Sequence, residues 1–420
     1  APARWWGVGR FFLQAGAAYG RYAVRLLRRP WEYRELHKEL FGVLFRSFRD
    51  AVGPLKGPLI KIAQTLSYLD MDLSPSARGL LTELQHRSPP LAADKIRAVV
   101  RRSLGQDPRD LFAEWSDAPL AAASVSQIHL ARLKEGARVA VKVRYPGIDR
   151  IVKSDLRAVR AFLPLLARAT GVRNVRENFE EAKKMLLAEC DFRREAAFMD
   201  RFRSIFAEDP IISIPAVYHG YCSESVLTMD YVDGQTYAEF KATGTGADFD
   251  RAGQALVRFF DKAALQHGLF NADPHPGNYL FKNGRVYFLD FGFCKEWTPE
   301  FIGFWKAQTR AVLKNDLPAF AEATKAMGVT NTDGTFNYGE LLAGYRATLE
   351  KMLIDRKPFR FTPEFVREEG RVIFNKQLGG GKAVNPPEIL AFSRLFWGQH
   401  AVLADLGARI DYSAFNTFLE

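Results

Sequence analysis

Cysteine and long apolar runs are both scarce in this sequence. Its 420 residues include only three cysteines, Cys190, Cys222 and Cys294, and no two of them form a CxxC pair. This spacing argues against a disulfide framework or a zinc site, and it suits a reducing compartment. No run reaches the roughly 18 consecutive apolar residues that a spanning helix needs. With 47% apolar and 25% charged residues, the composition is that of an ordinary globular protein.

Acidic residues are also in deficit, and the first 31 positions contain none. The formal net charge of +11 favours an anionic partner such as a nucleotide or an acidic lipid headgroup. The excess basic residues are not arranged in any recognisable nucleic-acid-binding module, so we expect no nucleic acid partner. Residues 1–31 combine arginine with tryptophan, phenylalanine and tyrosine, which predicts an element on a membrane surface. The alternatives are a packed helix with a solvated basic face or the remnant of a targeting sequence.

Hydrophobic periodicity divides the chain into helical and strand-rich stretches. Helical spacing covers residues 32–110, 149–205 and most of the chain after residue 250. Alternating or continuous apolar runs predict strands at 128–133, 139–143, 216–221 and 225–232, and a short hairpin of 279–281 with 286–289. This mixture favours an α+β fold.

Three polar residues have the spacing that phosphoryl transfer needs. Asp273 and Asn278 lie in Asn271-Ala-Asp-Pro-His-Pro-Gly-Asn278, and Asp290-Phe-Gly292 follows across the predicted hairpin. The reaction requires a carboxylate near the attacking oxygen and hard oxygen ligands that hold Mg²⁺ against the phosphates. We therefore interpret Asp273 as catalytic, and Asn278 and Asp290 as magnesium ligands in an ATP site. Each motif alone occurs by chance, but their order on suitable local structures is specific.

Lys142 lies in the middle of the apolar strand 139–143, where it costs desolvation unless an anion partners it. Kinases place such a lysine against the α- and β-phosphates and pair it with a helix glutamate. Alone, Lys142 fits equally well a half-exposed strand facing solvent. The segment 189–195 offers three acids, Glu189, Asp191 and Glu195. On one helix, Asp191 and Glu195 would share a face and Glu189 would turn away. One lysine cannot easily pair with all three acids, which suggests a second cation nearby. The alternative is a solvated helix of mixed charge.

A glycine-rich phosphate loop is missing. Four small residues stand in its place, namely Ala121, Ala122, Ala123 and Ser124. They permit close approach of the backbone, but alanine disfavours the positive φ angles that glycine adopts. This predicts nucleotide handling unlike that of a common protein kinase, or else a simple turn before a strand. The segment after Gly292 also lacks a long activation loop and an Ala-Pro-Glu sequence.

Together these motifs resemble the UbiB/ADCK (AarF) family of atypical kinases over about residues 50–300. The Lys-x-Gly-Gln signature of that family corresponds here to Lys61-Ile-Ala-Gln64, with Ala63 in place of glycine. The resemblance implies a two-lobed kinase-like fold with a helical N-terminal extension packed over the active site. The expected segments are a basic aromatic stretch (1–50), the extension (51–117), an N-lobe with an enlarged helical insert (118–232) and a mostly helical C-lobe (233–420).

The resemblance also implies roles for further residues. Glu195 would be the partner of Lys142, and Lys61 would pair with Glu189 and Asp191. The nucleotide region would include Gln64 and the loop 121–124, while the adenine pocket would be lined by Met229, Asp230 and Val232, with backbone groups of 230–232 bonding the base.

At the level of activity, the resemblance implies binding and hydrolysis of Mg-ATP, or phosphoryl transfer to a small molecule, in support of ubiquinone biosynthesis. The expected location is peripheral on a membrane, on the cytoplasmic or mitochondrial-matrix side. The expected partners are ATP, an anionic lipid or lipid-quinone precursor, and other proteins of quinone biosynthesis. Two alternatives are a protein kinase with an unusual substrate and a nucleotide-gated lipid-binding scaffold.

Overall fold

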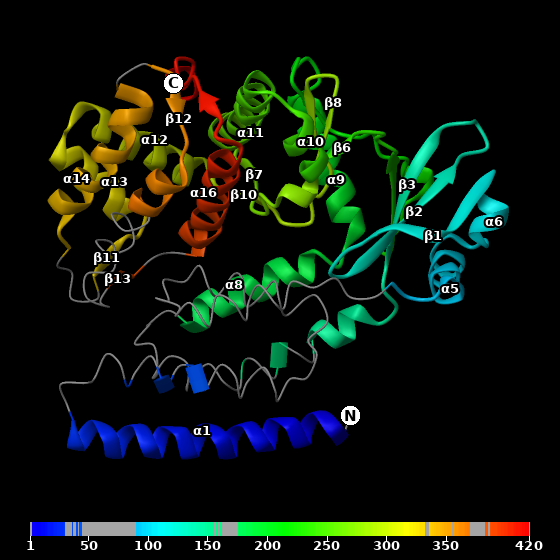
Figure 1. Cartoon of the computed structure of the whole chain (residues 1–420), viewed down its shortest axis with the longest axis horizontal. Helices are drawn as coiled ribbons and strands as arrows, with labels where there is room; N and C mark the ends of the chain where they lie inside the picture. Colours follow the sequence, from blue (N-terminus) through cyan, green and yellow to red (C-terminus); the bar gives the residue numbers. More distant parts are fainter. Residues whose placement is uncertain are drawn as a thin grey trace. The chain divides into compact units, whose positions relative to one another are not determined.

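The computed structural model describes residues 2–29, 90–153, 175–331, 336–354, 357–369 and 387–419, with short pieces at 36, 39–40, 42–43, 156–157, 160 and 383–384. The chain forms two compact units (Figure 1). The first comprises residues 1–96, 119–128 and 144–190, and the second comprises residues 97–118, 129–143 and 191–420. Among the described residues, no helix has the length and apolar character needed to cross a membrane.

The first unit contains two long described helices, α1 (Pro2–Arg28) and α8 (Val175–Ala188). The first turn of α1 carries no acid and its last turn carries Arg25 and Arg28, which suit the negative end of the helix dipole. Arg25 Nη1 lies 2.5 Å from Glu39 Oε2. Both side chains of this pair are more than half exposed, so the pair contributes little to stability.

A four-stranded sheet has the strand order β1-β2-β3-β5. Its strands are β1 (Glu114–Ala122), β2 (Ser126–Arg132), β3 (Arg138–Arg144) and β5 (Val226–Asp230). The strands predicted at 128–133, 139–143 and 225–232 are therefore confirmed. In the antiparallel pairing of β3 with β5, Lys142 stands opposite Leu227. β3 is buried along most of its length, so its lysine enters the protein interior rather than solvent.

The strand predicted at 216–221 is wrong. The structure has a single bridge between Val217 and Met229, followed by the 3₁₀ turn η2 (His219–Tyr221). The carboxylate of Asp230 accepts hydrogen bonds from the Ala216 N–H and the Tyr218 hydroxyl, at 2.9 and 2.8 Å. These side-chain bonds satisfy the segment locally, and a strand ladder is not extended.

A second four-stranded sheet, with the order β4-β9-β8-β6, carries the hairpin between the two motifs that contain Asn278 and Asp290. It contains the predicted hairpin, observed as β8 (Tyr279–Lys282) and β9 (Arg285–Phe288), between β4 (Ile212–Ser213) and β6 (Gln235–Thr236). Asn283 has a φ of 52° in the hairpin turn and Gly284 has 69°, as a tight two-residue turn requires. Helices α10 (Tyr237–Thr243) and α11 (Gly246–His267) follow β6, and each begins with a capping box.

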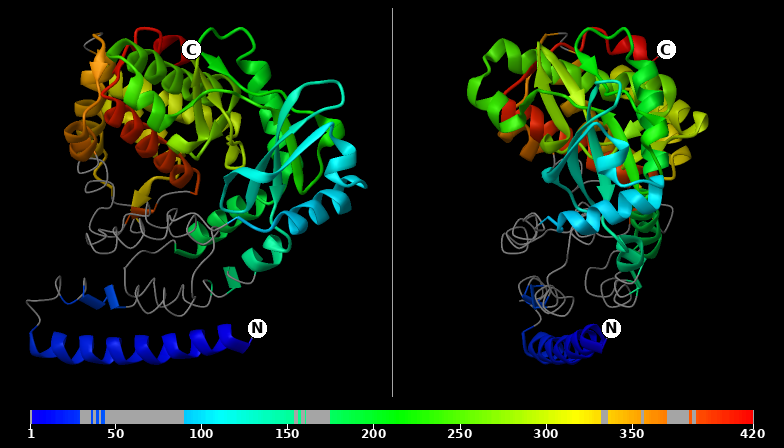
Figure 2. Two further views of the ribbon diagram at one scale, coloured as in Figure 1. Left: turned by 45° about the vertical axis from the view of Figure 1, so that its right-hand side comes forward. Right: turned by 90° about the vertical axis from the view of Figure 1, so that its right-hand side faces the viewer.

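The C-terminal helices form one group, drawn in yellow to red in Figures 1 and 2. The helices are α12 (Pro299–Lys314), α13 (Leu317–Ala326), α14 (Tyr338–Leu349) with the π-helical turn η4 (Glu350–Ile354), α16 (Pro387–Leu406) and α17 (Asn416–Leu419). Two short antiparallel pairs accompany them, β11 (Thr330–Asn331) with β13 (Ala383–Val384) and β12 (Phe359–Arg360) with β14 (Arg409–Ile410). The predicted helical character after residue 250 is confirmed for the described residues.

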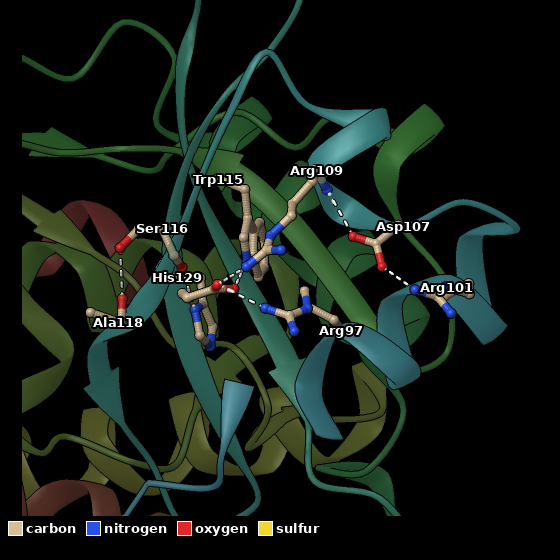
Figure 3. Close-up of polar contacts among 9 residues, drawn as sticks. Arg97, Arg101, Asp107, Arg109, Trp115, Ser116, Ala118 and His129 are labelled. Atoms are coloured by element: carbon tan, nitrogen blue, oxygen red, sulfur yellow. Dashed lines mark hydrogen bonds and ion pairs between the residues drawn. The ribbon is translucent and has the colours of Figure 1, made fainter. Parts of the chain in front are cut away.

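One polar cluster in the second unit joins β1 and β2 to the helices α5 (Ala93–Leu104) and α6 (Pro108–Leu111) (Figure 3). The Asp117 carboxylate accepts hydrogen bonds from Arg97, Arg109 and the Trp115 indole. The Trp115 ring stacks on His129 at 4.8 Å, and His129 Nδ1 lies 2.8 Å from a main-chain oxygen of β1. Burial lowers the pKa of His129, which favours the neutral ring. The arginines are already paired, so the cluster fastens the helices to the sheet.

Gly253 of α11 provides a test of how the C-terminal segment packs. A Cβ at this position would lie 2.7 Å from Ala408 Cβ and 2.8 Å from Ile410 Cδ1. We expect Gly253→Ala to lower the free energy of unfolding by about 1–3 kcal/mol through overpacking, despite the better helix propensity of alanine. Gly303→Ala in α12 is the matched control, because nothing lies within 4 Å of its Cβ position. Denaturant unfolding measures both, and equal stabilities would contradict the packing.

Candidate active site

Lys142 reaches Glu195 in the interior of the second unit. Its Nζ lies 2.6 Å from Glu195 Oε1, and the two residues are 3% and 1% exposed. Glu195 occupies the first turn of α9 (Phe192–Ile205). The Lys142 ammonium also lies 5.2 Å from the centre of the Phe192 ring. The buried strand lysine therefore has the anionic partner that its desolvation requires.

Asp290 extends this pair into a group of three charges. Its Oδ2 lies 3.5 Å from Lys142 Nζ, and its Oδ1 accepts a hydrogen bond from the Gly292 N–H at 2.9 Å. The Phe291 N–H points to Glu195 Oε1 at 3.4 Å. Phe291 is fully buried against the Phe202 ring. The backbone after Asp290 is thus held both by an aromatic core and by the carboxylate that binds the lysine.

The loop that carries Asp273 follows β7 (Leu269–Asn271), which pairs with β10 (Cys294–Glu296). The loop ends in the 3₁₀ turn η3 (Pro276–Asn278). The Asn278 amide donates to the Asp273 main-chain oxygen at 3.0 Å and reaches its Oδ2 at 3.4 Å. The predicted spacing therefore brings Asp273 and Asn278 into direct contact.

Asn271 joins the loop to Asp290, and sequence reasoning assigned it no role. Its Nδ2 donates to the Asp290 main-chain oxygen at 2.6 Å, while its Oδ1 accepts from the Asp273 N–H at 3.0 Å. One buried amide thus fixes both of the segments that carry the predicted site residues. The available signal was a polar residue at the end of a buried strand, two positions before the aspartate. Lys142, Glu195, Asp290, Asp273 and Asn278 form one connected network through Asn271.

The predicted helix across 189–195 is wrong, and so is the shared face for Asp191 and Glu195. Asp191 caps α9, because its carboxylate accepts from the Arg193 N–H at 3.0 Å. Glu189 lies in the turn before that cap and belongs to the first unit, where it accepts a hydrogen bond from Ser124 Oγ at 2.9 Å. An aspartate that caps its own helix interrupts the helical spacing that the prediction assumed.

The small-residue loop forms a tight turn at the end of β1. Ala121 and Ala122 are the last residues of β1, and the Ala123 N–H donates to the Ser126 oxygen at 2.8 Å. Ser124 connects this turn to Glu189, which is 3% exposed. Lys61 and Gln64, the predicted partners from the extension, lie outside the described residues. Their pairing with Glu189 and Asp191 stays a prediction.

The segment predicted to line the adenine pocket continues from β5. Met229 is buried and stands opposite Ala140 of β3. The Asp230 N–H donates to the Ala216 oxygen at 2.9 Å and the Tyr231 N–H to the Arg138 oxygen at 3.1 Å, so neither is available to a base. Within the described part of the chain, the Val232 N–H has no hydrogen-bond acceptor. Val232 is therefore the donor in this segment that fits the prediction.

Magnesium fits the donor set of this network. Asn278 donates through its Nδ2 to Asp273, so its amide oxygen could serve as a ligand, and Asp290 would contribute a carboxylate. Mg²⁺ is usually held by one or two carboxylates together with phosphate oxygens and water. In the described residues, no group of three or more His, Cys, Asp or Glu side chains has the geometry of an all-protein metal site.

Comparison with known proteins places the chain in a family. The model of the ABC1 atypical kinase-like domain matches residues 83–324, so the chain belongs to the ABC1 atypical kinase-like family. This confirms the resemblance that the motifs predict, and the structure has the α+β kinase-like fold. A solved structure of Mycobacterium tuberculosis Rv3197 with erythromycin is similar in fold, with a TM-score of 0.62 at 24% identity over 92% of this chain and 99% of that chain.

Several curated relatives share this similarity. The chloroplastic protein ACTIVITY OF BC1 COMPLEX KINASE 8 of Arabidopsis thaliana is 31% identical over 68% of this chain and 39% of its own length. The probable protein kinase UbiB of Aeromonas hydrophila is 32% identical over 59% of this chain and 48% of its own. The mitochondrial atypical kinase COQ8 of Saccharomyces cerevisiae is 25% identical over 85% and 72%. The match thus spans less than two thirds of the first two relatives.

The buried Glu195 predicts a pH dependence of stability. Burial, with a contribution from the Asp290 carboxylate, raises the pKa of Glu195 from 4.5 to about 7, although Lys142 opposes the shift. Between these pH values the folded state retains a proton that the unfolded state has lost, so this group makes the free energy of unfolding fall as pH rises from about 4.5 to about 7.

We expect Glu195→Gln to remove the pH-dependent contribution of Glu195 to the free energy of unfolding. The difference in that free energy between wild type and variant should therefore change between about pH 4.5 and 7 and be constant above about pH 7. Thermal or denaturant unfolding at a series of pH values measures it. The exposed Glu296→Gln is the control for the chemical change. Parallel curves for wild type and Glu195→Gln would rule out the shift.

Proposed function

We propose that the chain binds ATP with Mg²⁺ and either hydrolyses it or transfers its γ-phosphoryl group to a small, lipid-related acceptor. The observation that carries this proposal is the buried network in which Lys142 contacts Glu195 and Asp290 while Asn271 ties Asp290 to the Asp273 loop. The network brings the Lys142 cation together with the side-chain oxygens of Asp273, Asn278 and Asp290. A cation and oxygen ligands of this kind match what the phosphates of a nucleotide and their metal ion require.

The residues divide the chemistry between them. Lys142, oriented by Glu195, is suited to bind the α- and β-phosphates as a cation. Asn278 and Asp290 would hold Mg²⁺, which when bound neutralises charge on the phosphate oxygens. Asp273, fixed by Asn271 and Asn278, would orient the attacking water or hydroxyl and accept its proton. The Val232 N–H would donate to the adenine base.

A small acceptor is favoured over a peptide by the chain that follows Gly292. β10 begins at Cys294 and pairs back on β7, and α12 begins at Pro299. The described segment between the metal-binding motif and the next helix is therefore short and committed to a strand pair. A protein kinase normally needs a longer activation segment in this place to dock a peptide.

The setting that we propose is isoprenoid quinone biosynthesis at a membrane surface, on the cytoplasmic or mitochondrial-matrix side. The motifs resemble the UbiB/ADCK family, and relatives of the chain carry the names UbiB and COQ8. The acceptor would be a lipid-quinone precursor, and other proteins of quinone biosynthesis would be partners. In α1, Val24 is 50% exposed and Leu27 86%, beside exposed arginines. These features support contact of α1 with an anionic lipid surface.

The first test is Asp290→Asn, assayed for Mg-dependent ATP turnover. We expect turnover to fall by roughly a hundredfold or more, because loss of a metal-binding carboxylate removes several kcal/mol of charge stabilisation. The control is Asp200→Asn, the same change in an exposed aspartate that pairs with His219. Undiminished turnover in Asp290→Asn, with the control also active, would remove the basis of the assignment.

The second test addresses the membrane. We expect the protein to sediment with vesicles that contain anionic lipid, and its ATP turnover to rise with them. Reversing the charge at Arg21, Arg25 and Arg28 to glutamate should weaken binding by at least about a hundredfold, at about 1 kcal/mol per basic residue. Asp290→Asn should bind as the wild type does. Equal binding to purely zwitterionic vesicles would contradict a role for acidic lipid.

A further inference from the structure

A cavity lies among the C-terminal helices, in the same unit as the proposed nucleotide site but lined by other residues. Its volume is about 120 Å³, and α11, α12, α14 and α16 contribute to its wall. Within this group, α11 contacts both α12 and α16, and α12 contacts α14. Aromatic rings form much of the lining, including those of Phe260, Trp297, Trp305, Phe396, Trp397 and Tyr412.

Asp261 of α11 is the exception in this lining. Its side chain belongs to the cavity wall and the residue is only 6% exposed. Among the described residues it makes no hydrogen bond or ion pair, and the buried Tyr412 of the same wall is near enough to interact with it electrostatically. A buried carboxyl group without a partner is costly, so native proteins almost always satisfy such a group. Its persistence at a cavity wall indicates that a ligand supplies the partner.

Neighbouring polar groups of the lining do have partners in the protein. His400 Nδ1 lies 2.8 Å from Glu369 Oε2, and Gln308 donates to Thr324 at 2.8 Å. Gln399 donates to a main-chain oxygen of α11, also at 2.8 Å. These three polar groups of the wall are therefore bonded to residues other than Asp261. Burial raises the pKa of Asp261 well above its usual range, as expected for a carboxyl without a counter-ion.

The walls identify the kind of partner. Aromatic faces carry negative charge density and attract cations, and tryptophan does so most strongly. The size limits the ligand further, because a cavity of roughly 150 Å³ in another protein holds benzene.

We infer that this cavity binds a small organic cation, an ammonium group bearing alkyl substituents, with Asp261 as its counter-ion and the surrounding aromatic rings as its walls. Alkylated ammonium groups are weakly hydrated and are recognised by aromatic cages in proteins. The charge would be matched by one carboxylate, and the alkyl groups would fill the apolar remainder. The inference does not depend on ATP binding.

Choline and its neutral isostere 3,3-dimethylbutan-1-ol make a matched pair of probes, because they share shape and differ in charge. Calorimetric titration of the full chain measures the affinity for each. We expect choline to bind and the neutral alcohol to bind at least about tenfold more weakly, as a desolvated cation–π site with a counter-ion requires. Equal affinity for both, or no binding of choline at millimolar concentration, would overturn the inference.

Asp261→Asn tests the counter-ion directly. The amide keeps the shape but carries no charge, so we expect choline affinity to fall at least about tenfold and the affinity for the neutral alcohol to stay within about twofold. The control is Asp250→Asn, on the same helix but outside the cavity wall, which should bind choline as the wild type does.

The unliganded stability of Asp261→Asn is a second readout. Because Asp261 has no partner in the described chain, its replacement should leave the melting temperature unchanged or raise it. Choline should raise the melting temperature of the wild type and not that of the variant. A variant that melts much lower would show that Asp261 has a structural partner, and unaltered choline binding in the variant would exclude its role as counter-ion.

Discussion

The buried contact between Lys142 and Glu195 is the interaction on which the candidate active site depends. Two charges removed from water lose several kcal/mol of solvation each, and their attraction offsets this only when geometry is good. Here the contact is 2.6 Å and Asp290 lies within 3.5 Å of the same ammonium. Hydrophobic residues would be at least as stable in this place. The pair therefore makes sense as a means of orienting a cation towards an anionic ligand rather than as a source of stability.

Asn271 solves a second problem, which is to hold two acids near one another without adding charge. Its amide donates towards the Asp290 segment and accepts from the Asp273 segment. A carboxylate there would repel its neighbours, and an apolar residue would leave a buried N–H unsatisfied. A neutral side chain with one donor end and one acceptor end meets both needs. The segments that carry Asp290 and Asp273 are thus fixed relative to one another through their backbones.

Motif order allowed the fold class and the core of the site to be predicted, because the catalytic loop, hairpin and strand lysine are each local in sequence. Predictions failed where a side chain altered the local backbone. Asp191 caps α9 instead of joining the face of Glu195, and Asp230 binds the segment that was expected to form a strand. The Asp261 cavity gave no sequence signal at all, since its walls come from several helices spread over residues 257–415 and an aspartate on an amphipathic helix is ordinarily exposed.

The cavity and the catalytic loop are also physically joined. The helix that carries Asp261 leads through Gly268 directly into β7 and the Asp273 loop. The Trp297 ring, part of the cavity wall, lies 4.3 Å from that of Phe270 on β7. On α16, a Cβ at Gly398 would collide with the Pro274 ring, so this helix approaches the loop closely just before the cavity residues Gln399 and His400. Close-packed elements transmit small displacements, and coupling between two binding sites is reciprocal. A cation that tightened nucleotide binding through this contact would itself be bound more tightly when nucleotide is present.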